Sequence, residues 1–193
     1  MKIFLVRHTA YSNPDNIFPF RLPLALSKEG SEHASRIGQW FKNNSLFKLP
    51  IYTSPIKRSS QTADIIAKII DSKVSYDERL TEAFCPNLQG KKAPDDEEET
   101  WKMQCMDSSR ESSESLQKRA LECFQEKVKE DKNCILISHG DPLAALLYYV
   151  IEKPLTRCFF DDDHYKLYIK RGEVVQIEIK NEYKGYKLGR FTV

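Results

Sequence analysis

The chain has 193 residues, a hydrophobic fraction of 40%, a charged fraction of 30% and a formal net charge of +2 at pH 7. This length suits one globular domain, residues 1–193, with enough apolar residues for its own core. Basic and acidic residues are interleaved, so the sequence lacks the clustered basic excess of nucleic-acid binders. No apolar run is long enough to cross a bilayer. We therefore expect neither a nucleic acid nor a membrane as partner, and the sequence indicates no oligomeric state.

The cysteines and the first residues indicate the compartment. Five cysteines form no C-x-x-C pair and their number is odd, which is typical of free thiols in a reducing environment. The apolar run that begins at Ile3 ends at Arg7, which is too short for a signal peptide. We expect a cytoplasmic protein.

The first third of the chain predicts a strand, a loop and a helix. Ile3–Val6 is a continuous apolar run of strand length, as in strands that are covered on both faces. The proline-rich stretch 13–23 predicts a loop. Ser27 is the expected cap of a helix whose apolar face extends from Ala34 to Phe41.

A second strand and helix follow. Ile51–Thr53 has the pattern of a short strand. Ser54 then reads as a helix cap and Pro55 as the first helical residue, where its missing N–H has no consequence. The helix is expected to continue to Ile70, and Val74–Tyr76 predicts a further strand.

Residues 91–115 differ in character from the rest of the chain. They contain the acidic run Asp95–Glu99 and many serines, and we expect a lid-type insertion there. Ser108 and Glu111 have the spacing of a capping box. The apolar residues of 116–128 then step by four, which predicts a helix.

The last part of the chain predicts a strand, a helix and a hairpin. Cys134–Ile137 is another buried-type strand, and Asp141-Pro142 reads as the cap and first residue of the next helix. Apolar and polar residues alternate in 165–169 and in 174–179, on either side of Arg171-Gly172, which predicts a closing hairpin. Strands that alternate with helices favour an α/β architecture with a largely parallel sheet.

Three of the predicted strands end in polar, cationic or imidazole residues: Arg7-His8, Ser54 leading to Arg58, and Ser138-His139. In open α/β sheets, ligands bind beyond the carboxyl ends of the strands. Helix N-termini at such ends favour an anion because their first N–H groups are free. The sequence therefore predicts an electropositive pocket assembled from distant segments.

A phosphate monoester, which carries close to two negative charges at neutral pH, suits such a pocket. Arg7 and Arg58 would hold its oxygens with charge-assisted hydrogen bonds, and His139 beside the anion would keep its proton. His8 would be the nucleophile, neutral, with its second nitrogen bonded to a backbone carbonyl. Water would hydrolyse the resulting phosphohistidine. Glu82 is the candidate acid for the leaving oxygen and the later base toward water.

Four motifs carry a resemblance to a known family: Phe4–His8, Ser54–Ala63, Leu80–Glu82 with Gly90 downstream, and Ile137–Gly140. In this order they resemble the histidine phosphatase superfamily, in the branch of the cofactor-dependent phosphoglycerate mutases and their phosphatase relatives. The resemblance implies a phosphoglycerate mutase-like three-layer sandwich, with a mostly parallel central sheet and helices on both faces. It also implies a phosphohistidine mechanism that uses no metal and no other cofactor.

The resemblance assigns the same roles as the charge argument, with His8 as nucleophile, Glu82 as proton donor, and a phosphoryl group held by Arg7, Arg58 and His139. Asn13 corresponds to an asparagine that the family carries one position later, and it is a candidate phosphate contact. Thr9 replaces the usual glycine after the nucleophile. Either the loop differs locally or the Thr9 hydroxyl joins the pocket.

The predicted function is that of a phosphomonoester phosphatase acting on a small phosphorylated metabolite. The segment after the proton donor is shorter than in the mutases that the family includes, which leaves the pocket open to water and favours hydrolysis. A cofactor-dependent phosphoglycerate mutase, a phosphohistidine-protein phosphatase and a non-catalytic phosphate-binding protein remain alternatives. Asp161–His164 is interpreted as a solvated loop, because consecutive acids seldom point at one metal ion.

Overall fold

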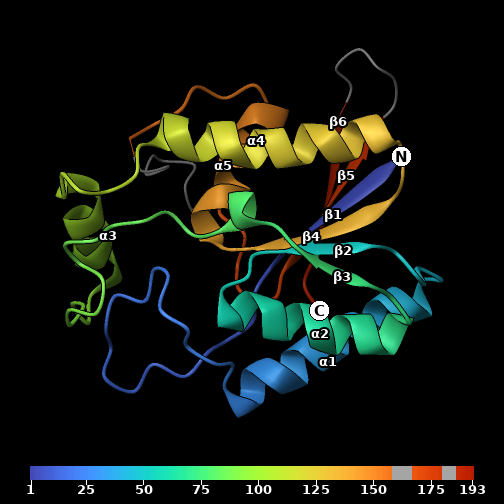
Figure 1. Cartoon of the computed structure of the whole chain (residues 1–193), viewed down its shortest axis with the longest axis horizontal. Coiled ribbons are helices and arrows are strands. Elements are labelled where there is room, and N and C mark those ends of the chain that lie inside the picture. Colours follow the sequence, from blue (N-terminus) through green and yellow to red (C-terminus); the bar gives the residue numbers. More distant parts are fainter. Residues whose placement is uncertain (158–166, 180–185) are drawn as a thin grey trace.

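A central sheet organises the computed structural model (Figure 1), which describes residues 1–157, 167–179 and 186–193. Within these residues the sheet has six strands, in the order β3 (Val74–Tyr76), β2 (Ile51–Thr53), β4 (Cys134–Ser138), β1 (Lys2–Arg7), β5 (Val174–Ile179) and β6 (Tyr186–Phe191). The first four strands run parallel, β5 is antiparallel to β1, and β6 is antiparallel to β5. The prediction of a mostly parallel sheet is confirmed.

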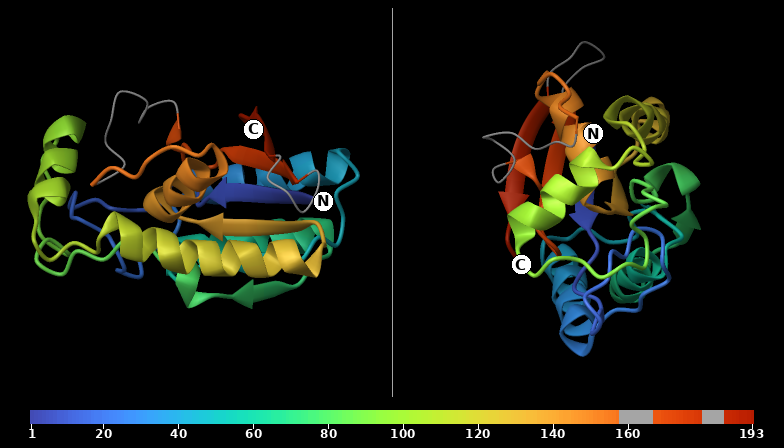
Figure 2. Two further views of the ribbon diagram at one scale, coloured as in Figure 1. Left: turned by 90° about the horizontal axis from the view of Figure 1, so that it is seen from above. Right: turned by 90° about the vertical axis from the view of Figure 1, so that its left-hand side faces the viewer.

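Helices cover both faces of this sheet (Figures 1 and 2). Side chains alternate along β1, so Ile3 and Leu5 pack in a different core from Phe4 and Val6. The first core is closed by α4 (Ser113–Glu130) and α5 (Gly140–Val150), and the second by α1 (Lys28–Asn43) and α2 (Lys57–Ile70). The three-layer α/β sandwich is therefore confirmed.

The helices start where the local hydrogen bonds allow it. Ser27 caps α1 as predicted, because its side chain accepts from the Gly30 N–H. The prediction for α2 is wrong by two residues, since α2 begins at Lys57 and the Ser54 hydroxyl instead accepts from the Ile56 N–H at 3.2 Å. The start of α5 is also earlier than predicted, because His139 is the residue that precedes its first turn.

The predicted capping box before α4 is wrong. Ser112 is the cap of this helix, and its side chain accepts from the Ser115 N–H. The Glu111 carboxylate does not reach back to a cap residue, because it pairs with Arg119 at 2.8 Å. Ser108 therefore lies in the loop before α4.

The predicted hairpin between residues 165–169 and 174–179 is also wrong. Strand β5 already has β1 on one side and β6 on the other, so no edge is left for another strand. Among the described residues of the first stretch, 167–169 form no strand, and residues 165 and 166 lie outside the described residues. Strand β6 was not predicted.

Residues 91–115 contain the helix α3 (Glu97–Met106), which lies beyond the end of the sheet (Figures 1 and 2). Trp101 is the buried residue of this helix. The segment before α3 is attached to the loop that follows β1, because the Phe18 N–H donates to the Lys91 oxygen at 2.8 Å and the Gly90 N–H donates to the Phe18 oxygen. Action of 91–115 as a lid remains a prediction. In the described part of the chain, no helix is long and apolar enough to cross a membrane.

Candidate active site

His8 lies just after β1 with its ring fixed in one tautomer. Its Nδ1 is 2.8 Å from the Thr9 oxygen, and its Nε2 is 3.1 Å from Nε of Arg58. A carbonyl oxygen only accepts and an arginine Nε–H only donates, so Nδ1 carries the proton and Nε2 carries the lone pair. The sequence prediction required this tautomer of a nucleophilic His8.

His139 lies behind His8 at the end of β4. The two ring centroids are 5.0 Å apart, and Nε2 of His139 is 2.8 Å from the Ser54 hydroxyl oxygen. Nδ1 of His139 and Nε of Arg7 are both buried, and neither has a hydrogen-bond partner among the described residues. A buried polar nitrogen without a partner is costly, and for Arg7, which lines the cavity described below, this is expected where a ligand supplies the acceptor.

Arg58 enters the site from the first turn of α2 and is buried, with 1% of its surface exposed. Its Nη2 donates to the Phe20 oxygen at 2.6 Å and its Nη1 to the Leu22 oxygen at 3.3 Å. The third bond, from Nε, goes to His8. Attack by His8 requires that this bond be released, because the same lone pair must reach phosphorus.

Both imidazoles are neutral in this structure. Burial lowers the pKa of His8 well below its usual value, and the charges of Arg58 and Arg7 lower it further. Burial, Arg58 and then His8 lower the pKa of His139 in the same way. The prediction that His139 keeps its proton concerns the phosphate-bound state, where a dianion would raise this pKa.

Glu82 follows a single 3-10 turn, η1 (Glu78–Leu80), and its Oε1 accepts from the Ala83 N–H at 3.0 Å. Burial and the neighbouring Asp141 carboxylate raise the pKa of Glu82 to about 7. Asp141 itself stays paired, with Arg110 and with the Tyr168 hydroxyl at 3.1 Å. Glu82 therefore holds a proton on a large fraction of molecules at neutral pH, as a general acid must.

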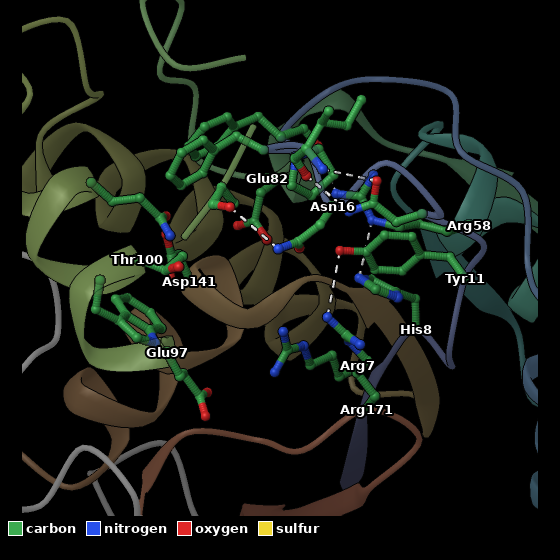
Figure 3. A pocket seen from close by; sticks show the side chains of 18 of the residues that line it. Arg7, His8, Tyr11, Asn16, Arg58, Glu82, Glu97, Thr100, Asp141 and Arg171 are labelled. Atoms are coloured by element: carbon green, nitrogen blue, oxygen red, sulfur yellow. Dashed lines mark hydrogen bonds between the residues drawn. The ribbon is translucent and has the colours of Figure 1, made fainter. Parts of the chain in front are cut away.

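A cavity of about 870 Å³ joins these groups. Five of the predicted site residues line it, and Figure 3 shows four of them around the same space: Arg7, His8, Arg58 and Glu82, with Asn13 as the fifth. The predicted residue His139 does not line the cavity, because it lies behind His8. The rest of the wall comes from the loop 16–20, which lies beside Arg58, and from residues between 93 and 104, several of them on α3.

Asn13 and Thr9 have local roles in the loop after β1. The Asn13 amide donates to the Ile17 oxygen at 2.9 Å, and its oxygen accepts from the Ile17 N–H at 3.2 Å. It braces the loop, and a contact with phosphate remains a prediction. Thr9 is fully buried, and its hydroxyl lies 3.3 Å from that of Thr62 on α2. The Thr9 hydroxyl therefore does not line the cavity, so the alternative in which it joins the pocket is wrong.

Sequence reasoning missed several residues of the site. Tyr11 lines the cavity, and its ring centre is 5.2 Å from Cζ of Arg58 and 4.8 Å from Cζ of Arg171. Tyr168 also lines the cavity and stacks under Arg7, at 4.9 Å. No motif indicated these residues. Asp141 was assigned only to a helix start.

No group of three or more His, Cys, Asp or Glu side chains in the described ranges is arranged to hold a metal ion. The acidic stretch Asp161–His164 lies outside the described residues.

Several solved structures share this fold. YhfR of Bacillus stearothermophilus superposes with a TM-score of 0.79 at 23% identity, over 97% of this chain and 94% of that one. The α-ribazole phosphatase of Shigella flexneri gives 0.78 at 18% identity, over 98% and 95%. A mycobacterial glucosyl-3-phosphoglycerate phosphatase gives 0.77 at 17% identity, over 100% and 98%. The chain thus has the phosphoglycerate mutase-like fold.

The chain belongs to the histidine phosphatase superfamily (branch 1), whose profile matches residues 3–183. It is similar to the 2,3-bisphosphoglycerate-dependent phosphoglycerate mutase of Thermoplasma acidophilum, with 31% identity over 134 residues, 67% of this chain and 62% of that protein. Phosphoglycerate mutase 1 of Saccharomyces cerevisiae is 34% identical over 94 residues, 47% of this chain and 38% of the yeast protein. The chain thus spans less than two thirds of either mutase.

Proposed function

We propose that this protein is a phosphomonoester phosphatase that forms a covalent phosphohistidine at His8 on a small phosphorylated metabolite. One observation carries the proposal. The unprotonated Nε2 of His8 lies on the same cavity as Glu82, a carboxyl group whose pKa is raised to about 7. A neutral nucleophile and a protonated acid are therefore present together near pH 7.

In the first step, Arg7 and Arg58 hold the phosphate oxygens, and Arg58 leaves Nε2 of His8 to do so. Nε2 attacks phosphorus, and the bond from phosphorus to the ester oxygen breaks. The Glu82 carboxyl gives its proton to that oxygen, so the alcohol leaves uncharged. The arginines neutralise the charge that spreads over the remaining oxygens.

In the second step, the Glu82 carboxylate takes a proton from a water molecule as the water oxygen attacks phosphorus. The nitrogen–phosphorus bond breaks, its electron pair returns to Nε2 of His8, and inorganic phosphate leaves. The bond from Nδ1 of His8 to the Thr9 oxygen holds the ring in place through both steps.

Mutase activity is the second candidate, and its support is the similarity to mutases in sequence. Hydrolysis is supported by the size of the cavity, about 870 Å³, which leaves room for water beside a small leaving group. Residues of 16–20 and 93–104 add walls to a cavity that is still partly open, and its volume is in the range of small-molecule sites. A phosphatase releases phosphate from 3-phosphoglycerate, whereas a mutase converts it to the 2-isomer when 2,3-bisphosphoglycerate is supplied.

Trapping the intermediate tests the proposal. The protein is mixed with 4-nitrophenyl phosphate, quenched in alkali to preserve phosphohistidine, and digested for mass spectrometry. In the wild type we expect a peptide that carries phosphohistidine at position 8. The His8→Ala variant should give neither this peptide nor turnover. Normal turnover in folded His8→Ala would refute the mechanism.

A reducing compartment is also part of the proposal. Cys85, Cys123 and Cys134 carry free thiols, which supports a cytoplasmic location.

A further inference from the structure

A turn on the far side of β1 brings two more cations to the cavity. Lys170 and Arg171 both line it, although they are about 160 residues from His8 in the chain. Neither forms an ion pair with a carboxylate in the described part of the chain. Two adjacent cations without an acidic partner at a ligand cavity indicate a place for an anion.

The turn that carries Arg171 is rigidly built. The Gly172 N–H donates to the Arg7 oxygen at 3.0 Å, and the Glu173 carboxylate accepts from the Lys170 N–H at 2.7 Å while it pairs with Arg190 at 3.2 Å. Gly172 has a φ of +75°, and a Cβ there would lie 2.2 Å from the His33 ring. Arg171 is therefore presented to the cavity by a fixed backbone.

Tyr11 separates Arg171 from the groups that hold the transferred phosphate. Figure 3 shows its ring between Arg58 and Arg171, and its hydroxyl accepts from Nη2 of Arg171 at 3.4 Å. The charge of Arg171 lowers the pKa of His8 less than the charges of Arg58 and Arg7 do. Arg171 thus lies near the phosphate site but beyond its first ring of ligands.

We propose that Arg171, with Lys170 beside it, binds a second anionic group, either a carboxylate or a further phosphate, on the part of the substrate that leaves. This inference rests on the proposed phosphatase function and adds the substrate class to it. The oxygens of the transferred phosphate already have Arg7 and Arg58, so the cations beyond Tyr11 face the alcohol portion of the ester.

Matched substrate pairs test this assignment. Phosphate release is measured from 3-phosphoglycerate and glycerol 3-phosphate, which differ in a carboxylate, and from fructose 1,6-bisphosphate and fructose 6-phosphate, which differ in a second phosphate. The ratio of kcat/KM within each pair is the readout. The wild type should prefer the member with the additional anion, and the pair with the larger ratio identifies which anion the subsite accepts.

Arg171→Gln should reduce the larger of the two kcat/KM ratios about tenfold, the usual value of one charge-assisted hydrogen bond. Arg171→Lys should retain part of the preference. Arg36→Gln is the matched control, because it removes the same charge from α1, outside the cavity, and should leave the ratio unchanged. Inhibition by inorganic phosphate gives a second readout and should change less than the ratio does.

If Arg171→Gln leaves the kcat/KM ratio unchanged, this inference is overturned. It is also overturned if kcat/KM falls equally for both members of each pair and inhibition by phosphate becomes weaker. The second result would assign Arg171 to the transferred phosphate. Absence of phosphate release from all four esters in the wild type is a different outcome, because it refutes the phosphatase function itself.

Discussion

The proton on Glu82 gives the most direct test of the mechanism, and Glu82→Gln is the perturbation. The glutamine amide keeps an oxygen that can accept from the Ala83 N–H, as Oε1 of Glu82 does at 3.0 Å. It also has no charge, like the protonated carboxyl that burial and Asp141 favour. The variant therefore keeps the shape and charge of the acid form and loses only the transferable proton.

The magnitude depends on the leaving oxygen. An alkoxide needs a proton because its parent alcohol is about as weak an acid as water. For glycerol 3-phosphate, kcat/KM should therefore fall by the usual contribution of a general acid, about 10²- to 10⁴-fold. Nitrophenolate is stable without a proton, so kcat/KM for 4-nitrophenyl phosphate should fall less than about tenfold.

The assay is kcat/KM for both esters across pH, with a rapid-quench measurement for the aryl ester. In the wild type, activity on glycerol 3-phosphate should decline above about pH 7, because Glu82, with a pKa of about 7, must be protonated to act. This decline should be absent from Glu82→Gln. The variant should also show a burst of nitrophenol, because it lacks the base for hydrolysis of the phosphohistidine. Equal losses for both esters would exclude Glu82 as the proton donor.

Three further predictions concern the surroundings of the site. Arg110→Met should lower the free energy of unfolding by about 3–5 kcal/mol in urea denaturation, since it leaves Asp141, only 5% exposed at its side chain, without its cation; an unchanged midpoint would show that the pair is well solvated. EDTA should leave kcat/KM unchanged, and a strong loss would indicate a metal bound at residues 161–164. Glu97→Gln should raise kcat/KM for fructose 1,6-bisphosphate about twofold at low salt, because Glu97 lines the cavity and Glu99 does not; an equal rise in the control Glu99→Gln would refute a local effect.

The parallel part of the sheet could be predicted because its strands are buried on both faces. β1 and β4 are continuous apolar runs, and each forms a core with helices on either side. The alternation of these runs with helical patterns then leaves few topologies. Strand β6 could not be found in this way, because Tyr186–Phe191 is only half-buried and carries Gly189 in its interior.

The start of α2 could not be predicted because the site competes for the expected cap residue. Ser54 has the residue type and position of a helix cap, but its hydroxyl oxygen lies 2.8 Å from Nε2 of His139 and 3.2 Å from the Ile56 N–H. These contacts delay the helix by two residues relative to the prediction. The propensity of Ser54 to cap a helix is thus overridden by its contact with His139, 85 residues away in the chain.

The convergence of Arg7, His8, Arg58 and Glu82 on one cavity could be predicted, because parallel strands bring their carboxyl ends to one edge of the sheet. The mutual geometry of the two histidines could not. A strand end places His139 near the phosphate, but in the structure it contacts Ser54 and the ring of His8 and does not line the cavity.

Arg171 was missed because of one error in strand pairing. The sequence pattern predicts that residues 174–179 pair with 165–169, which would place Arg171 at the tip of a hairpin. In the structure β5 runs antiparallel to β1, with Val174 opposite Val6. Residues just before β5 must then lie beside residues just after β1, so this register alone brings Arg171 to His8. If β5 is assigned to the edge of β1, the third arginine of the site follows from the sequence without any motif.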